Sequence, residues 1–145
     1  MKKKIKSIKK MNAVLVGIAG SNNAFSLSLY NLKAYALQNP EIQKHWDIKV
    51  IQKPLINFGE KYNKKKLSNL VNEILSKKPN LIGFSCYMWN IDSFLKITED
   101  IKKILPKVKI LLGGPEIATE YVKNSHFDKY KIDFLVSGEG ELTFS

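Results

Sequence analysis

Short apolar runs alternate with longer amphipathic stretches along the chain. Residues 13–18 form an uninterrupted apolar run, which is typical of a strand covered on both faces of a sheet. Further strands are predicted at residues 46–52, 81–86, 109–112 and 132–136, each short and bounded by loop-forming residues. Because each strand is followed by a longer stretch, the pattern predicts repeated βα units and one parallel sheet.

The stretches between the strands carry apolar residues at helical spacing. This spacing predicts helices at residues 24–38, 64–76 and 91–105, and a short helix that ends near Lys123. Right-handed crossovers then give a Rossmann-like or flavodoxin-like α/β fold. We expect a five-stranded parallel sheet of order 2-1-3-4-5 with helices on both faces.

The length of 145 residues fits one domain, which we assign to residues 11–145. Residues 1–10 are basic and are predicted to be a solvated tail. No apolar run approaches the roughly 18 residues of a membrane span. Cys86 is the single cysteine, so an internal disulfide is excluded and a reducing, cytoplasmic location is expected.

The formal net charge of +11 raises the question of nucleic acid or an anionic membrane. All 24 basic residues are lysine, whereas arginine is the preferred bidentate reader of guanine and phosphate. The lysines are also scattered, apart from those at 2–4 and 64–66. We therefore expect a solvated surface, with neither nucleic acid nor a membrane as partner.

Ligands of open parallel sheets bind at the carboxyl ends of the strands. Four unusual segments fall there, at residues 20–23, 85–90, 113–116 and 137–141. The double glycine at 113 and 114 removes two β-carbons where a flat ligand could approach the backbone. A tight strand-to-helix turn is the alternative explanation. The aromatic residues of 85–90 would line a ring-shaped ligand or, alternatively, cap the core.

Other site chemistries find little support in the sequence. Segment 20–23 lacks the glycine patterns of dinucleotide and P-loop sites. His45 and His126 are distant from the four segments and are predicted to be surface residues. Cys86 has no cationic neighbour in sequence to lower its pKa. Because no nucleophile has a base beside it, this chain alone is not expected to be catalytic.

Four segments together resemble the N-terminal cobalamin-binding domain of class B radical S-adenosylmethionine enzymes. They are residues 14–18, 81–90, 109–116 and 133–141, and the resemblance extends over roughly residues 12–144. It implies that the cofactor carries the chemistry, typically methyl transfer, while the domain binds and orients it. The implied cofactor-binding residues are Gly20, Ser21, Asn22, Asn23, Ser85, Tyr87, Met88, Trp89, Gly113, Gly114, Pro115, Glu116, Gly138, Glu139 and Gly140.

Two departures from related domains refine this expectation. Methionine-synthase-like domains carry DxHxxG after the first strand, whereas residues 21–26 here contain no histidine, so cobalamin would bind without a protein imidazole on cobalt. The CxxxCxxC motif of a 4Fe-4S cluster is also absent. The resemblance places that cluster and S-adenosylmethionine in a C-terminal domain beyond this chain. A flavodoxin-like FMN-binding domain and a ligand-free interaction domain remain as alternatives.

Overall fold

A computed structural model describes residues 9–21, 24–54, 63–117 and 127–145 of the chain. Its five-stranded sheet has the order β2-β1-β3-β4-β5. Every neighbouring pair of strands is parallel, which confirms the predicted topology. The strands are β1 (Met11–Ala19), β2 (Trp46–Pro54), β3 (Leu81–Ser85), β4 (Lys109–Gly113) and β5 (Phe134–Leu135).

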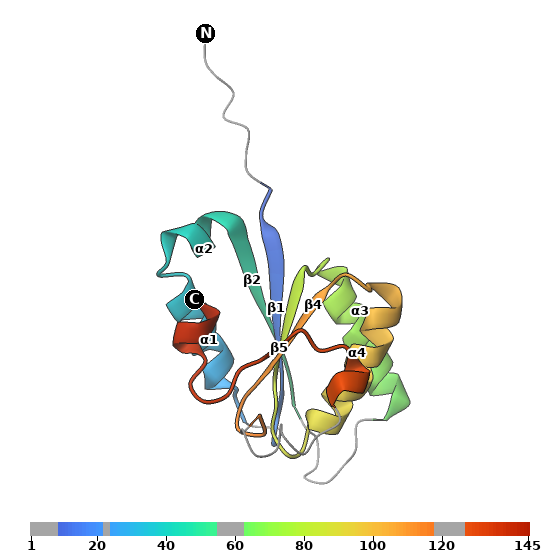
Figure 1. The fold of residues 1–145 in the computed structure, drawn as a ribbon. Coiled ribbons are helices and arrows are strands. Elements are labelled where there is room, and N and C mark those ends of the chain that lie inside the picture. The colour runs from blue at the N-terminus through green and yellow to red at the C-terminus, as the bar shows by residue number, and fades with distance from the viewer. Residues whose placement is uncertain (1–8, 22–23, 55–62, 118–126) are drawn as a thin grey trace.

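Helices cover both faces of this sheet (Figure 1). One face carries α1 (Leu27–Ala36), α2 (Pro40–His45) and α6 (Glu141–Phe144). The other carries α3 (Lys64–Ser76), α4 (Ile91–Ile104) and the 3-10 helix η1 (Phe127–Tyr130). No helix in the described part of the chain is long and apolar enough to cross a lipid bilayer.

Two of the predicted elements need corrected boundaries, and a third is not tested. The first helix ends at Ala36 and not at residue 38, because Asn39 caps a separate helix, α2, that has Pro40 in its first turn. Strand β5 is limited to two residues, whereas 132–136 was predicted. The short helix expected near Lys123 lies largely outside the described residues, as does most of the basic tail.

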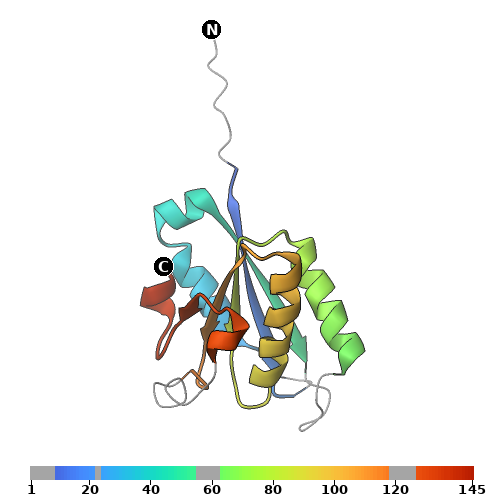
Figure 2. The same ribbon diagram turned by 45° about the vertical axis from the view of Figure 1, so that its right-hand side comes forward.

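The sheet face under α3 and α4 is filled by large apolar side chains, which alternate along the strands. The rings of Phe84 and Phe94 pack with centroids 4.6 Å apart, joining β3 to α4. The strand residues of this face are all buried, and they include Val14, Val16, Ile18, Ile82, Phe84, Ile110 and Leu112. Figure 2 shows α3 and α4 side by side over this face. It forms the main hydrophobic core.

The opposite face, under α1, alternates in the same register but carries smaller residues. Its central strands present Leu15 and Gly17 from β1, Gly83 and Ser85 from β3, and Gly113 from β4. The core cluster on this side is correspondingly smaller, with Ala13, Leu15, Leu29, Ala36 and Ile48 as its buried members. Because glycine and serine cannot fill the space under a helix, this face is left with a hollow.

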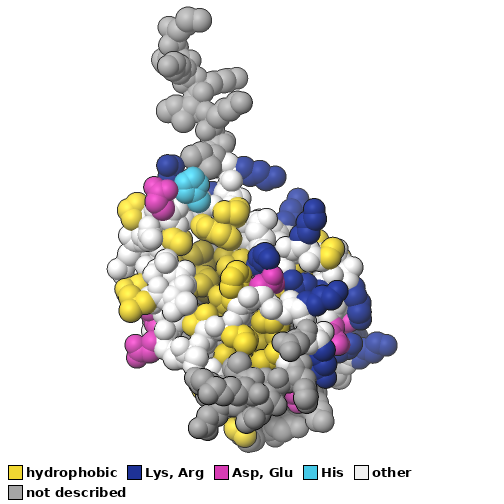
Figure 3. Space-filling view, viewed as in Figure 1, with side chains coloured by type: hydrophobic (Ala, Val, Ile, Leu, Met, Phe, Trp, Pro, Cys, Tyr) yellow, Lys and Arg dark blue, Asp and Glu magenta, His cyan; other side chains and the backbone are white. Residues whose placement is uncertain are grey.

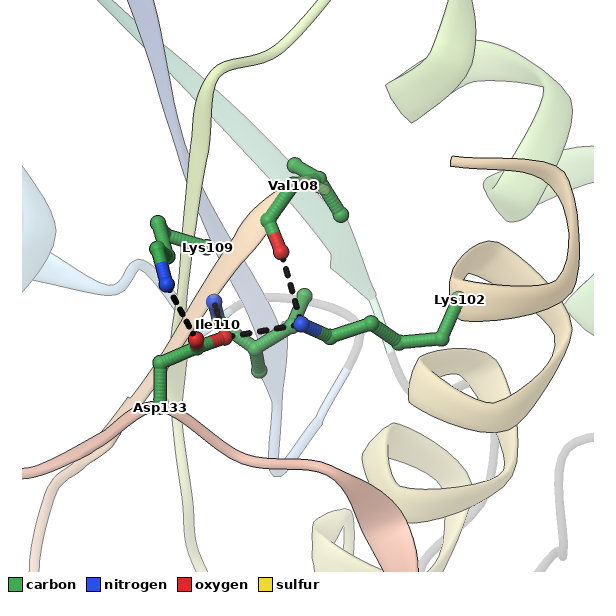
Figure 4. A network of polar contacts seen from close by, with 5 residues as sticks. All are labelled: Lys102, Val108, Lys109, Ile110 and Asp133. Carbon is green, nitrogen blue, oxygen red and sulfur yellow. Dashed lines mark hydrogen bonds and ion pairs between the residues drawn. The ribbon is translucent and has the colours of Figure 1, made fainter. Parts of the chain in front are cut away.

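Strand β5 is anchored by a polar network at its amino end (Figure 4). The Asp133 carboxylate accepts hydrogen bonds from Lys102 Nζ and Lys109 Nζ, both at 2.8 Å, and from the backbone N–H of Ile110 at 3.0 Å. Lys102 Nζ also donates to the carbonyl oxygen of Val108. The network joins α4, β4 and the start of β5, and so fixes the strand that leads into segment 136–141.

Candidate functional site

A cavity of about 630 Å³ lies between the sheet and α1, at the carboxyl half of the strands. Segments distant in sequence meet there, from β1, α1, β3, β4 and the stretch that follows β5. The lining residues are Leu15, Ser28, Leu29, Leu32, Gly83, Phe84, Ser85, Tyr87, Leu111, Gly113, Gly114, Pro115, Ile117, Val136, Ser137, Gly138, Glu139, Gly140, Glu141 and Phe144. This size is within the range of small-molecule and cofactor sites.

The floor of the cavity is made by small residues on the central strands. A β-carbon added at Gly113 would lie 3.7 Å from the carbonyl oxygen of Val136, an ordinary van der Waals contact. The fold itself therefore does not require glycine at 113, and a larger side chain there would extend into the cavity. Leu15 and Leu111 complete an apolar floor suited to a flat ring system.

Helix α1 forms one wall with Ser28, Leu29 and Leu32. The hydroxyl oxygen of Ser28 is buried and has no hydrogen-bond partner. An unpartnered buried hydroxyl is costly in a folded protein, and such groups are usually satisfied by a water or a ligand. The sequence did not single out this helix, because its apolar spacing predicted only a core-facing role.

Gly114 is required by the backbone and not by ligand approach. Its φ of +100° lies in the left-handed region, which favours glycine. A β-carbon there would lie only 2.6 Å from the carbonyl oxygen of Cys86 and 2.8 Å from the Cys86 amide nitrogen. The tight-turn alternative therefore holds for Gly114, although the residue still contributes backbone to the cavity wall.

The aromatic residues after β3 divide between the cavity and the core. Tyr87 lines the cavity, and its ring stacks on Trp89 with centroids 4.6 Å apart. Trp89 itself packs against the main core and donates its indole N–H to the carbonyl oxygen of Ile18 at 3.0 Å. Trp89 thus contributes to the core, which is one of the two roles that the sequence left open for the aromatic residues of 85–90. Met88 is 75% exposed and does not line the cavity.

The remaining predicted cofactor-binding residues also divide into those that line the cavity and those that do not. Gly138, Glu139, Gly140 and Pro115 line the cavity together with Ser85 and the two glycines of β4 and its turn. Gly20 instead approaches Trp89, where an added β-carbon would lie 3.3 Å from the indole ring. Ser21 is exposed and Glu116 is half-buried, both outside the lining. Asn22 and Asn23 lie outside the described residues.

Charge around the cavity is acidic, although the chain as a whole is basic. Glu139 and Glu141 belong to the lining, and no lysine is found among the described residues that form it. Burial raises the pKa of the nearby Cys86 thiol to about 12, and the Glu116 carboxylate adds to this effect. Cys86 is therefore a protonated, inert core residue, as the sequence suggested. Within the described residues, no three metal-binding side chains gather into a metal site.

Comparison with known proteins gives a family and two relatives. The sequence profile of the B12 binding domain family matches residues 46–145. The cobalamin-dependent radical SAM methyltransferase TokK of Streptomyces tokunonensis is 32% identical over 68 residues, covering 46% of this chain and 10% of the relative. The 2-(S-pantetheinyl)-carbapenam-3-carboxylate methyltransferase of Streptantibioticus cattleyicolor is 28% identical over 116 residues, covering 78% of this chain and 15% of the relative. The chain thus spans a small part of either relative.

Solved structures share the fold of this chain at low sequence identity. A CheY-like protein (tadZ) of Pseudomonas aeruginosa aligns with a TM-score of 0.52 at 12% identity, covering 92% of this chain and 89% of that one. The type II dehydroquinase of Butyrivibrio crossotus aligns with a TM-score of 0.54 at 9% identity, covering 93% of this chain and 92% of the dehydroquinase chain. These likenesses support the architecture alone, because the fold hosts many unrelated functions.

Proposed function

We propose that this chain, which belongs to the B12 binding domain family, holds a cobalamin whose nucleotide tail enters the cavity between the sheet and α1. The observation that carries the proposal is the hollow under α1, floored by Gly83 in the middle of β3 and by Gly113 at the carboxyl end of β4. An apolar floor and a buried, unpartnered hydroxyl on Ser28 fit an aromatic group that carries hydrogen-bonding nitrogen atoms.

The lining residues suggest a division of roles. Leu15, Leu29 and Leu111 would pack against the faces of the heterocycle. The hydroxyl groups of Ser28 and Ser85 would hydrogen-bond polar atoms of the tail. Glu139 and Glu141, at the end of the segment that follows β5, would accept hydrogen bonds from the side-chain amides of the corrin. When bound, cobalamin would supply the group-transfer chemistry, and this chain would hold and orient it.

We further propose that no imidazole of this chain ligates the cobalt. The single histidine among the described residues is His45, at the end of α2 and directly before the amino end of β2. It pairs with Glu41 at 3.3 Å, one helical turn earlier. This position is at the opposite edge of the sheet from the cavity, and residues 21–26 of the loop after β1 contain no histidine.

The parent activity follows from the relatives as a further proposal. Both relatives are methyltransferases, and one is named as cobalamin-dependent and radical SAM. We infer that this domain serves an enzyme of that class. A 4Fe-4S cluster and S-adenosylmethionine would then be bound by residues that this chain does not contain, and the domain would act in the cytoplasm.

The test is a titration of the purified chain with hydroxocobalamin and with methylcobalamin, followed by visible absorbance and calorimetry. We expect saturable binding and a spectrum without a histidine-ligated cobalt. Heat and absorbance that stay flat up to millimolar cobalamin would contradict the proposal and favour the ligand-free alternative.

FMN serves as the competing ligand in the same titration. Its phosphate needs a cradle of cationic or N–H donors, whereas the described lining of the cavity offers two glutamates and no lysine. We therefore expect FMN to bind more weakly than cobalamin. The reverse order of affinities would favour the flavodoxin-like alternative.

A further inference from the structure

In the described part of the chain, three asparagines stand directly before a helix, and the side chain of one of them does not cap its helix. Asn39 and Asn63 accept hydrogen bonds from backbone N–H groups of the first turns of α2 and α3, at 3.0 Å and 2.9 Å. This is the usual role of asparagine at an N-cap. Asn90 precedes α4 in the same way, yet its side chain makes no capping bond. The N–H of Ile91 is instead accepted by the carbonyl oxygen of Tyr87.

The side chain of Asn90 connects the ends of two strands. Its amide nitrogen donates to the carbonyl oxygens of Ile18 and Ser85, each at 3.1 Å. Its amide oxygen accepts the backbone N–H of Tyr87 at 2.8 Å. The residue is only 1% exposed. A buried side-chain amide with both of its ends bonded is strongly constrained in position.

The geometry of the sheet explains why this bridge is needed. Pairing between β1 and β3 ends at Val16 and Phe84, so the carbonyl oxygen of Ile18 lies beyond the ladder between these two strands, although Ile18 still pairs with Lys53 of β2. Both Asn90 and the Trp89 indole donate to that oxygen. These two hydrogen bonds tie the loop after β3 to the end of β1.

We propose that Asn90 is a positioning residue of the cofactor site, and that its role is to hold the cavity-lining residues Ser85 and Tyr87 in place and not to cap α4. Ser85 and Tyr87, two of the three residues whose backbone it bonds, line the cavity. The Tyr87 ring is further supported by its stack on Trp89. The proposal rests on the proposed function, because the ligand is the molecule that the cavity would receive.

Substitutions separate the two roles of Asn90. Aspartate and serine are both good N-cap residues, so Asn90→Asp and Asn90→Ser preserve any capping. A carboxylate cannot donate to the carbonyl oxygens of Ile18 and Ser85, and a serine side chain is too short to bridge both of them. Asn63→Ser is the matched control, because Asn63 caps α3 away from the cavity.

A second control addresses general loss of stability. Asn12 also bridges the chain through its side chain, donating to the carbonyl oxygens of Lys77 and Lys78 at the amino end of β1. Asn12→Ser therefore removes a comparable number of hydrogen bonds at the opposite edge of the sheet. All variants are compared at temperatures well below their own melting transitions, so that each is folded.

The first readout does not depend on any ligand. The chain has two tryptophans, so a Trp46→Phe background leaves Trp89 as the single indole. We expect Asn90→Ser to shift the emission of Trp89 and to weaken the near-ultraviolet dichroism of its stack with Tyr87. Asn63→Ser and Asn12→Ser should leave both signals unchanged. An unaltered Trp89 signal in both Asn90 variants would overturn the proposal.

The second readout is cobalamin affinity. We expect Kd to rise about tenfold or more in Asn90→Ser and Asn90→Asp, the equivalent of losing one or two hydrogen bonds. It should change less than about twofold in the two controls. Wild-type affinity in a folded Asn90→Ser variant would refute the positioning role. If wild type itself does not bind cobalamin, the proposed function fails, and the Trp89 readout alone decides the role of Asn90.

Discussion

The two glycines at the end of β4 meet different physical requirements. Gly113 has room for a β-carbon, since the nearest atoms of the fold would lie 3.7 Å or more away. Gly114 has no such room and adopts a positive φ. The space beside Gly113 is the cavity, whereas the space beside Gly114 is filled by the backbone of Cys86. Of these two adjacent glycines, Gly113 therefore leaves space for a ligand, whereas Gly114 is needed for the backbone turn.

This difference predicts the outcome of a matched pair of substitutions. Gly113→Val should lower cobalamin affinity tenfold or more, because its side chain would fill cavity volume, and should change the free energy of unfolding by less than about 1 kcal/mol. Gly114→Ala should destabilise the fold by about 2 kcal/mol, through strain and the contact with Cys86. Urea denaturation and cobalamin titration on both variants provide the test. Unchanged affinity in Gly113→Val would show that the ligand binds elsewhere.

The sequence predicted the roles of individual site residues less completely than it predicted the fold. The glycine pair was identified, but composition cannot tell which glycine faces a hollow and which closes a turn. Trp89 was expected to contact a ligand because its core partners come from β1, more than 70 residues earlier in the chain. Ser28 was missed because no local pattern distinguishes a hydroxyl that faces a cavity from one that faces solvent.

At the scale of elements, the hydrophobic periodicity predicted most boundaries correctly. Helix α3 spans the predicted residues 64–76, and β1 and β3 lie within two residues of their predicted ends. The apolar pattern of α1 is less one-sided than that of α3, because apolar residues occur around much of its circumference: Leu27 is 60% exposed, while Leu29 is buried. Periodicity therefore indicates that α1 is a helix, but it cannot specify which side of it faces the cavity.

Strand β5 is too short to be held by its ladder alone, and the Asp133 network stabilises it. Burial by itself would raise the pKa of Asp133, but hydrogen bonds from Lys102, Lys109 and the Ile110 N–H outweigh this effect and lower it to about 2 from an ordinary value of 3.8. The folded state therefore binds this proton more weakly than the unfolded state. The resulting stabilisation is complete above the unfolded pKa and is lost as pH falls through the folded pKa.

Asp133→Asn should reveal this contribution. At neutral pH the variant should be less stable than wild type by about 1–3 kcal/mol, because Lys102 would lose its charged partner in a partly buried setting. The difference between the two proteins should stay constant down to about pH 5 and shrink as pH falls from about 4 towards 2. Chemical denaturation at a series of pH values measures it. A difference that is independent of pH across this range would contradict the assigned pKa shift.

At the scale of the whole molecule, the two faces of the sheet have different roles. The face under α3 and α4 is closely packed, and the face under α1 is hollow. The surface is uneven too: in the view of Figure 3, lysines gather over the α3 and α4 side, and apolar side chains lie across the centre. Among the described residues, the lysines that contribute to the basic net charge therefore lie outside the acidic cavity lining.

Hydrogen exchange can test this asymmetry. If cobalamin enters the cavity, its binding should slow amide exchange in α1 and in segment 136–144, because both contribute lining residues to the cavity. Amides of α3 and α4 should exchange at unchanged rates. Mass spectrometry of peptides from the free and the cobalamin-saturated chain measures both regions. Protection confined to α3 and α4 would place the ligand on the packed face.

The contrast between the packed and the hollow face of the sheet also bears on how the ligand preference of such a domain can evolve. Substitutions at Gly113 or Leu111 alter the shape of the cavity, while the larger of the two hydrophobic cores lies on the other side of the same strands. A combinatorial library confined to the cavity-lining residues outside the smaller core cluster should therefore retain a high fraction of folded members. One confined to the α3 and α4 face should not. New ligand preferences are thus accessible to this scaffold through mutations that leave its folding largely untouched.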